Sequence, residues 1–406
     1  MDINAAKALL ERYGQTQLLD YYDELDDAGK RELLSNVGDI DFQTFNGVSF
    51  SKDRTVGRIS PADALSLSEI EKRRASFEEA GLQAIRAGKV AAVLLAGGQG
   101  TRLGWNAPKG TFNIGVNREL SIFECQLNNL KEVVKRAGAE PHVFIMTSSI
   151  NNEQTAEFFK VHDYFGYAPS KIHFYVQKTA PAVDLNGKIL LEEKHKPAVT
   201  PNGNGGWYVS LSQSPCGKIL EDEGIEWLNV YGVDNVLQRI CDPVFIGATL
   251  ASGLNSSAKV VTKATPDEKV GVLCKEDGLP AVVEYYEMPA KLREEREEDG
   301  QLKYRYGVIL NYLFKVEKLR EIGAATLPYH LALKKVACIK DGKKFVPEQP
   351  NAYKLETLAV DIVKLTGSCL GFEVLRENEF APVKNMTGVD SVETARALLI
   401  KNGVKI

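Results

Sequence analysis

The 406-residue chain lacks the closely spaced cysteines or histidines that would indicate a metal site. Its six cysteines are scattered without a C-x-x-C pair, and its five histidines lack metal-ligand spacing. No apolar run approaches the roughly 18–20 residues that cross a bilayer, and the first residues contain no apolar signal core. We therefore expect reduced cysteines, a cytoplasmic location, no zinc site and no membrane partner.

The chain also lacks an excess of charge of one sign. Its net charge is −4, and its basic residues are dispersed among acidic ones. Such a balance gives no reason to expect nucleic acid as a partner. A hydrophobic content of 44% is ordinary for a globular protein, and the length allows one main domain with smaller attachments. The oligomeric state is left open, with a monomer as one option.

Three consecutive segments differ in their patterns. Residues 1–88 carry apolar residues at helical spacing, with Ser66 or Ser68 as a candidate cap, and predict an N-terminal helical region. Residues 89–325 alternate strands with helices, which predicts an α/β domain around a mixed sheet that is covered on both faces. Residues 326–406 predict a small C-terminal α/β portion, with helices over 354–366 and 391–401.

A glycine-rich loop follows a buried strand predicted at residues 90–95. From Gly97 to Lys109 it reads G-G-x-G-T-R-L-x-x-x-x-P-K. Glycines lack a Cβ, so their amides can approach phosphate closely, and Arg102 and Lys109 add positive charge. Leu103 breaks the dinucleotide-binding fingerprint, and the loop lacks the Gly-Lys-Ser/Thr of a Walker A motif. The pattern resembles that of nucleotidyltransferases, and the alternative is a glycine turn with two solvated cations.

Two further features are candidate ligand sites. A second glycine-rich loop contains Gly203 and Asn204, and it suits a nucleobase edge or a sugar hydroxyl; the alternative is a flexible turn. Asp234 follows an apolar strand, where a carboxylate favours Mg²⁺ as its partner; the alternative is an Asx turn. Because ligands bind beyond the carboxyl ends of such strands, we expect Asp234 to lie beside the loop after residues 90–95.

Glu284 and Lys384 are two isolated candidates. Glu284 lies in a predicted strand, where it accepts hydrogen bonds from sugar hydroxyls or merely faces outward. Lys384 lies in an apolar, proline-containing loop, which favours a fixed ligand contact over a mobile surface cation.

Over nearly its whole length the chain resembles the eukaryotic-type UDP-N-acetylglucosamine pyrophosphorylases and their UDP-sugar pyrophosphorylase relatives. The motifs that carry this resemblance are residues 95–104, 108–110, 203–206, 233–235, 270–272, 283–285, 327–335 and 379–385. The resemblance implies a GT-A-like nucleotidyltransferase domain with a Rossmann-like mixed sheet. It also implies formation of a UDP-sugar and pyrophosphate from UTP and a sugar 1-phosphate, with Mg²⁺ as cofactor and Lys384 supplied by the C-terminal portion.

The resemblance also implies a role for each site residue. Three residues would be catalytic: Arg102, Lys109 and Lys384. The nucleotide would be bound by Leu95, Gly97, Gly98, Lys109, Gln177, Gly203 and Asp234, with Gln177 and Gly203 at uracil. The sugar would be bound by Asn204, Glu284 and Asn311. Asp234 would also hold the Mg²⁺ ion.

Gly307 and Val308 depart from the Gly-Asn pair usual in that family, which leaves the sugar open. We favour N-acetylglucosamine 1-phosphate, with glucose or galactose 1-phosphate as the alternative. A non-catalytic nucleotide-sugar-binding protein would lack the cations or the metal carboxylate, all of which are present. An NAD-linked oxidoreductase is disfavoured because Leu103 breaks its fingerprint.

Overall fold

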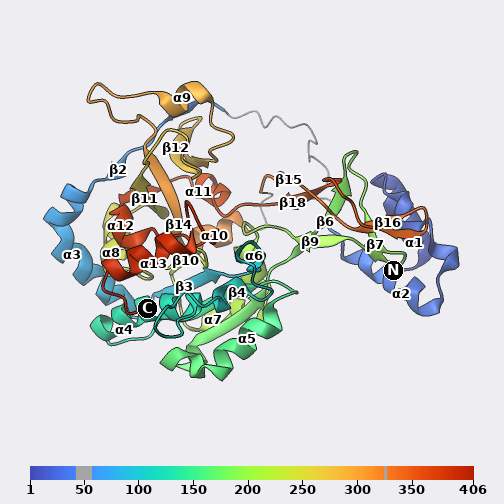
Figure 1. Cartoon of the computed structure of the whole chain (residues 1–406), viewed down its shortest axis with the longest axis horizontal. Helices are drawn as coiled ribbons and strands as arrows, with labels where there is room; N and C mark the ends of the chain where they lie inside the picture. The colour runs from blue at the N-terminus through green and yellow to red at the C-terminus, as the bar shows by residue number, and fades with distance from the viewer. Residues whose placement is uncertain (43–56, 324–326) are drawn as a thin grey trace. The chain divides into compact units, whose positions relative to one another are not determined.

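The computed structural model describes residues 1–42, 57–323 and 327–406 (Figure 1). The chain forms two compact units, each built from three stretches of sequence. Unit 1 comprises Met1–Arg54, Lys178–Gly206 and Ala325–Ala359, and unit 2 comprises Thr55–Gln177, Trp207–Ala324 and Val360–Ile406. This division follows spatial proximity, whereas the predicted segments 1–88, 89–325 and 326–406 are consecutive. The N-terminal segment is shared between the two units, and the predicted boundary at 325–326 lies outside the described residues.

Unit 2 contains an 11-stranded mixed sheet. Its main path runs β2-β19-β11-β14-β10-β3-β4-β5, and β12 joins β14 to the short strands β1 and β13. Neighbours along β10-β3-β4-β5 are parallel, whereas β14 is antiparallel to both β10 and β11. The strands are β1 (Ile59–Pro61), β2 (Ala64–Leu65), β3 (Val90–Leu95), β4 (Val143–Thr147), β5 (Ile172–Val176), β10 (Trp227–Gly232), β11 (Ser256–Thr262), β12 (Val272–Glu276), β13 (Leu279–Val283), β14 (Tyr306–Lys315) and β19 (Leu370–Glu373).

The helices of unit 2 begin where the sequence offers caps. Ser66 closes a capping box at the start of α3, and Ser121 caps α4, which ends at Gly138 in the left-handed conformation. The helices are α3 (Leu67–Arg86), α4 (Ile122–Ala137), α5 (Asn152–Val161), α6 (Trp207–Ser212), α7 (Pro215–Asp222), α8 (Pro243–Ser252), α9 (Ala290–Glu294), α10 (Val316–Ile322), α11 (Asp361–Leu365), α12 (Arg376–Glu379) and α13 (Val392–Lys401). The predicted helix over 391–401 is thereby confirmed.

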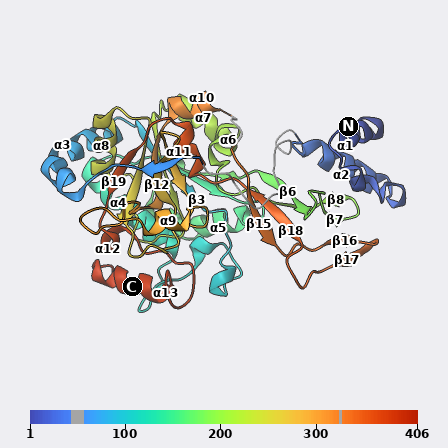
Figure 2. The ribbon, with the colours of Figure 1, turned by 90° about the horizontal axis from the view of Figure 1, so that it is seen from above.

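Helices cover both faces of the unit 2 sheet. On β14, Ile309 and Leu313 belong to the core formed with α3, α4 and α8, while Phe314 packs against Trp207 of α6 with ring centroids 5.9 Å apart. Because successive strand residues point to opposite faces, α6 lies on the face opposite that core. Figure 2 shows α3 and α8 side by side. The predicted α/β fold with a mixed sheet is confirmed.

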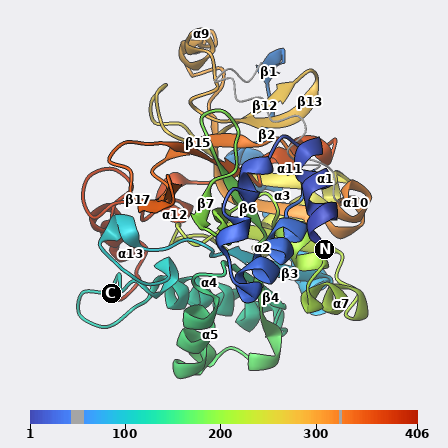
Figure 3. The same ribbon diagram turned by 90° about the vertical axis from the view of Figure 1, so that its right-hand side faces the viewer.

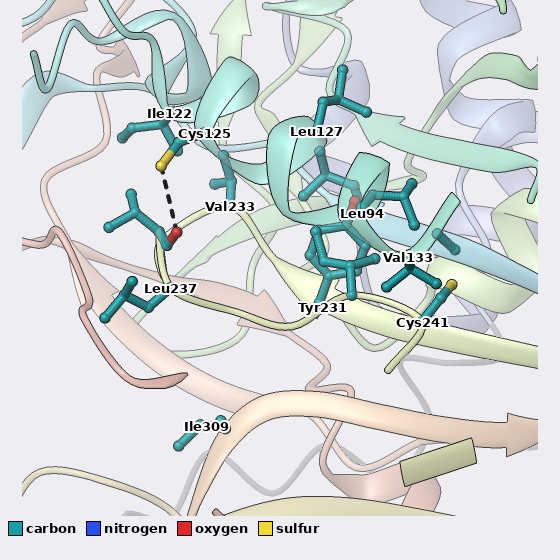
Figure 4. Close-up of a cluster of buried hydrophobic side chains, with 14 of the residues drawn as sticks. Leu94, Ile122, Cys125, Leu127, Val133, Tyr231, Val233, Leu237, Cys241 and Ile309 are labelled. Atoms are coloured by element: carbon teal, nitrogen blue, oxygen red, sulfur yellow. Dashed lines mark hydrogen bonds between the residues drawn. The ribbon is translucent and has the colours of Figure 1, made fainter. Parts of the chain in front are cut away.

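Helix α4 joins the sheet to the turn that follows β10. Figure 4 shows side chains of α4 beside those of β3 and β10, among them Leu94 and Tyr231. The Cys125 thiol donates to the Val236 carbonyl with a sulfur–oxygen distance of 3.6 Å. Apolar packing and this polar contact together hold the helix over the carboxyl ends of the two strands.

Unit 1 has its own core and an antiparallel sheet of order β15-β18-β6-β9. Figure 3 allows α1 and α2 to be followed beside its strands. Its elements are α1 (Ile3–Arg12), α2 (Asp27–Asp39), β6 (Thr179–Asp184), β7 (Leu191–Glu193), β8 (Lys196–Pro197), β9 (Val199–Pro201), β15 (His330–Lys334), β16 (Cys338–Lys340), β17 (Lys343–Phe345) and β18 (Ala352–Glu356). Short 3₁₀ turns of both units are η1 (Thr16–Leu19), η2 (Tyr22–Glu24), η3 (Thr101–Leu103), η4 (Lys109–Thr111), η5 (Asp163–Gly166) and η6 (Pro169–Lys171).

The predicted helix over 354–366 is wrong in its first part. Strand β18 occupies that stretch, with Tyr353 and Leu355 buried in unit 1 while Lys354 alternates with them. Its pairing with β6 and β15 outweighs the local helical pattern, and only α11 is helical there. None of the described helices is long and apolar enough to span a membrane.

Candidate functional site

The glycine-rich loop and Asp234 begin at the same edge of the unit 2 sheet. β3 and β10 are parallel neighbours with Leu95 opposite Gly232, and the Val233 N–H donates to the Leu95 carbonyl at 3.2 Å. The carboxyl ends of the two strands are therefore adjacent. The Lys109 ammonium forms an ion pair with the Asp234 carboxylate. The structure thus brings together the loop and the carboxylate, as expected from the sequence.

Backbone hydrogen bonds close the glycine-rich loop upon itself. The Gly100 N–H donates to the Ala107 carbonyl at 3.0 Å, and the Lys109 N–H donates to the Gly98 carbonyl at 3.2 Å. The fully buried Asn151 donates its side-chain amide to the same Gly98 carbonyl at 3.3 Å. The loop is consequently preorganised, with the side chain of Lys109 only 11% exposed.

Arg102 lies in η3 at the exposed side of this loop. Among residues 1–42, 57–323 and 327–406 it has no hydrogen-bond or ion-pair partner. A guanidinium without a protein partner beside a glycine-rich loop is available to an anionic ligand.

Gln177 and Gly97 are in direct contact. Gln177 follows β5, is 7% exposed, and donates its backbone N–H to the Thr147 carbonyl at the end of β4. A Cβ added at Gly97 would lie 2.7 Å from the Gln177 Oε1. Glycine at position 97 therefore lets the amide of Gln177 lie against the loop, and a larger residue would push that side chain aside.

Lys384 is placed beside Asp234 by a segment distant in sequence. The Val383 N–H donates to the Asp234 carbonyl at 2.8 Å, so Lys384 is the next residue along. The Lys384 ammonium lies 3.0 Å from the Asp390 Oδ2 and is 34% exposed. The structure thus gathers Arg102, Lys109, Asp234 and Lys384 at one edge of unit 2.

The two sugar candidates of unit 2 differ in their surroundings. Glu284 follows β13 and is partly exposed, with its Oε1 near Gly271. Asn311 is fully buried: its Oδ1 accepts from Asn229 at 2.7 Å, and its Nδ2 donates to the Arg239 carbonyl at 3.3 Å. Its amide is thus engaged in the interior of unit 2, and its role at the sugar stays a prediction.

Gly203 and Asn204 lie in unit 1, in a loop fastened to residues 357–359. Gly203 has φ +80°, and an added Cβ would lie 2.2 Å from the Thr357 carbonyl oxygen. The Asn204 Oδ1 accepts from the Ala359 N–H at 2.8 Å. These contacts fix the loop, which distinguishes it from the flexible turn that the sequence left open.

Substituting Gly203 with alanine should lower the stability of unit 1. We expect the free energy of unfolding to fall by about 1–3 kcal/mol, because the side chain adds both a disfavoured φ and a clash with Thr357. Thermal unfolding and limited proteolysis would measure the change. Gly300→Ala is the matched control, since Gly300 has φ +81° with nothing within 4 Å of an added Cβ. Equal losses in both variants would contradict the clash.

Two residues that hold site residues in place were not predicted from the sequence. Asn151 fastens the glycine-rich loop, and Asp390 pairs with Lys384. Asn151 does follow the apolar strand β4, whose carboxyl end lies at the same edge of the sheet, so its position offered a signal. Asp390 offered none, because its ion pair depends on how the loop after Lys384 folds back.

The residues at this edge would fit a magnesium ion whose remaining ligands are phosphate oxygens. The described part of the chain contains no cluster of three or more His, Cys, Asp or Glu that could hold a metal by itself. Mg²⁺, however, is commonly bound through one or two carboxylates together with phosphate oxygens. The Asp234 side chain is 44% exposed, and only one of its oxygens is paired with Lys109.

Comparisons with known proteins show which proteins the chain is similar to. Residues 51–402 match the family model described as UTP–glucose-1-phosphate uridylyltransferase. The chain is 36% identical to the UDP-N-acetylhexosamine pyrophosphorylase-like protein 1 of Homo sapiens, over 97% of this chain and 83% of that protein. It is 35% identical to the UDP-N-acetylglucosamine pyrophosphorylase of Saccharomyces cerevisiae, over 98% and 89%. The structure matches the crystal structure of the Trypanosoma brucei uridine diphosphate N-acetylglucosamine pyrophosphorylase with a TM-score of 0.80 and 27% identity, over 99% and 85%.

Proposed function

The chain belongs to the UTP–glucose-1-phosphate uridylyltransferase family, and from this membership we propose that it transfers the uridylyl group of UTP to N-acetylglucosamine 1-phosphate. The products are UDP-N-acetylglucosamine and pyrophosphate. The observation that carries the proposal is the gathering of Arg102, the Lys109–Asp234 ion pair and Lys384 at the carboxyl edge of the sheet. Three cations and one carboxylate at such an edge suit a triphosphate that meets a second phosphate.

The reaction is an in-line displacement at phosphorus. An oxygen of the sugar 1-phosphate forms a bond to the α-phosphorus of UTP, while the bond from that phosphorus to the bridging oxygen of pyrophosphate breaks. The attacking phosphate is already ionised at neutral pH, so no general base is needed. Positioning and charge stabilisation then dominate catalysis.

Each residue of the site has a role in bringing two anions together. The amides of Gly97 and Gly98 would hold the triphosphate, with Arg102 and Lys109 stabilising the departing pyrophosphate. Lys384 would neutralise charge at the α-phosphate. Leu95 brings the chain into the loop at the end of β3.

Four other residues would bind the two organic groups. Gln177 and Gly203 would contact uracil, whereas Asn204 and Glu284 would accept or donate hydrogen bonds at the sugar. Asp234 would hold Mg²⁺, which when bound supplies positive charge against the phosphate oxygens.

Pyrophosphate release tests the proposed function. Purified protein with UTP, Mg²⁺ and N-acetylglucosamine 1-phosphate should release pyrophosphate and form UDP-N-acetylglucosamine. The 1-phosphates of N-acetylgalactosamine, glucose and galactose, and other nucleoside triphosphates, are the matched alternatives. A preference for glucose or galactose 1-phosphate would overturn the sugar assignment, and no release with any sugar would overturn the function.

Replacing Arg102 with alanine should lower kcat/KM for UTP by about tenfold. The effect is moderate because an exposed guanidinium acts partly through water, which weakens its interaction with phosphate. Steady-state kinetics at varied UTP would measure it. Arg74→Ala, which removes an exposed guanidinium from α3, is the control. An unchanged kcat/KM in a folded Arg102→Ala variant would remove Arg102 from the site.

We also place this reaction in the cytoplasm. All six cysteines are free thiols in the structure, and five of them are buried. Free thiols are usual in a reducing compartment, where UTP-dependent synthesis of nucleotide sugars would take place.

A further inference from the structure

Asn235, the residue after Asp234, joins the turn that follows β10 to the segment that carries Lys384. Its Nδ2 donates to the Glu379 carbonyl at 2.7 Å, and its Oδ1 accepts from the Ala381 N–H at 2.8 Å. The same Oδ1 accepts from the Leu237 N–H at 3.2 Å. Asn235 is 3% exposed, so all three bonds are shielded from water. The Asn235 side chain therefore links the turn that carries Asp234 to the segment that carries Lys384.

The Lys384 segment is anchored at its start by a buried ion pair. Glu379 accepts from the Lys259 ammonium at 2.6 Å, and Asp242 accepts from the same ammonium at 2.9 Å. Lys259 lies on β11 and is fully buried. Burial alone would lower the pKa of Lys259, but the two carboxylates outweigh it and raise that pKa, so the ammonium stays charged. Glu379 is thus fixed to β11, an interior strand of the sheet.

The turn after β10 has an anchor of its own, which is formed by side chains of α4. The Gln126 Nε2 donates to the carbonyls of Gly232 and Asn235, both at 3.0 Å. The Asn129 Nδ2 donates to the Val236 carbonyl at 3.1 Å. The turn and the Lys384 segment therefore have separate anchors, and the Asn235 side chain lies where they meet.

We propose that Asn235 is a positioning residue that sets the spacing between the Asp234 carboxylate and the Lys384 ammonium. The Val383 N–H also donates a hydrogen bond to the Asp234 carbonyl at 2.8 Å, and this contact joins the two segments directly beside Lys384. Asn235 itself touches neither reacting phosphate, and it acts through Lys384. The inference rests on the proposed function, because it assigns Asn235 to the same uridylyl transfer.

The rate of uridylyl transfer should depend on the distance between the Asp234 carboxylate and the Lys384 ammonium. In an in-line displacement, the charges must match the positions of the phosphate oxygens as the transition state forms. A displacement of about 1 Å in a supporting group can cost on the order of 10²-fold in rate. Without the amide of Asn235, the Glu379 carbonyl and the Ala381 N–H lose their side-chain partner. The segment before Lys384 is then held to the turn mainly by backbone hydrogen bonds, which allows it to shift.

A double-mutant cycle tests this role. With Lys384 present, Asn235→Ala should lower kcat by about 10- to 100-fold and change KM for UTP by less than about twofold. In the Lys384→Ala background, the same change should lower kcat by less than about twofold, because the group it positions is gone. A merely structural role would give equal losses in both backgrounds.

Asn229→Ala is the matched control. Asn229 is fully buried on β10 and also makes three hydrogen bonds, to Asn311, Tyr312 and Cys241, but none to the Lys384 segment. Its effect on kcat should be the same with and without Lys384. If Asn235→Ala does not fold, Glu379→Gln replaces it in the cycle, since it loosens the same segment from Lys259.

The outcomes separate this inference from the proposed function. Equal losses from Asn235→Ala in the two backgrounds, with an active wild type, overturn the inference alone. Coupling of Asn229→Ala to Lys384 as strong as that of Asn235→Ala would also overturn it. A wild type that releases no pyrophosphate overturns the proposed function, and this inference with it.

Discussion

Lys384→Ala is expected to lower kcat by about 10²–10³-fold while leaving the fold intact. Removing one preorganised charge contact from a site that stabilises developing charge typically has this effect. Lys384 is preorganised here, because the Val383 N–H is bonded to the Asp234 carbonyl and the Lys384 ammonium is held by Asp390. The side chain is only partly exposed, so water cannot substitute fully for the lost ammonium.

Pyrophosphate release at saturating UTP and sugar 1-phosphate would measure this loss. The circular dichroism spectrum and melting temperature should match those of the wild type, because the Lys384–Asp390 pair is partly exposed and contributes little to stability. Lys401→Ala is the control, since Lys401 of α13 forms an exposed ion pair with Glu377 of α12. A folded Lys384→Ala variant with wild-type kcat would exclude Lys384 from catalysis.

Asp234→Asn is expected to abolish magnesium-dependent turnover. The substitution keeps the size of the side chain but removes the charge that a hard cation requires from its oxygen ligand. It also leaves the Lys109 ammonium without its carboxylate partner. Because the Lys109 side chain is only 11% exposed, the loss of its carboxylate partner should also lower the melting temperature, so turnover is measured well below that temperature.

The dependence of kcat on Mg²⁺ concentration distinguishes this role from a general loss of charge. Asp222→Asn is the control, because Asp222 pairs with Lys218 on the exposed face of α7. The control should keep the wild-type dependence. If Asp234→Asn shows the same magnesium dependence as the wild type, the ion is held elsewhere.

Local chemistry was sufficient to predict the elements around the glycine-rich loop. The strand predicted at residues 90–95 is β3 with the same bounds, since six consecutive apolar residues suit a strand buried on both faces. The adjacency of the loop and Asp234 was also predictable, because both follow parallel strands of one sheet. These predictions needed only short-range patterns and one topological rule.

Local patterns failed where long-range pairing decided the structure. Residues 352–356 form β18 because they pair with β6 on one side and β15 on the other. This pairing outweighs the helical pattern of the segment. Asn311 is buried against Asn229, which the sequence did not indicate, while its role at the sugar stays a prediction. A single residue on a strand has two possible faces, and only the packed sheet shows what covers each face.

Short motifs in the sequence were enough to identify the family and to predict that the first glycine-rich loop binds phosphate with the help of nearby charged residues. These properties reside in short motifs whose chemistry does not depend on distant neighbours. The folded arrangement was needed to see how Lys384 is held beside Asp234, by way of Asn235, Glu379 and the buried Lys259. Hydrogen bonds between segments far apart in the chain depend on the folded arrangement, and so no local pattern could indicate them.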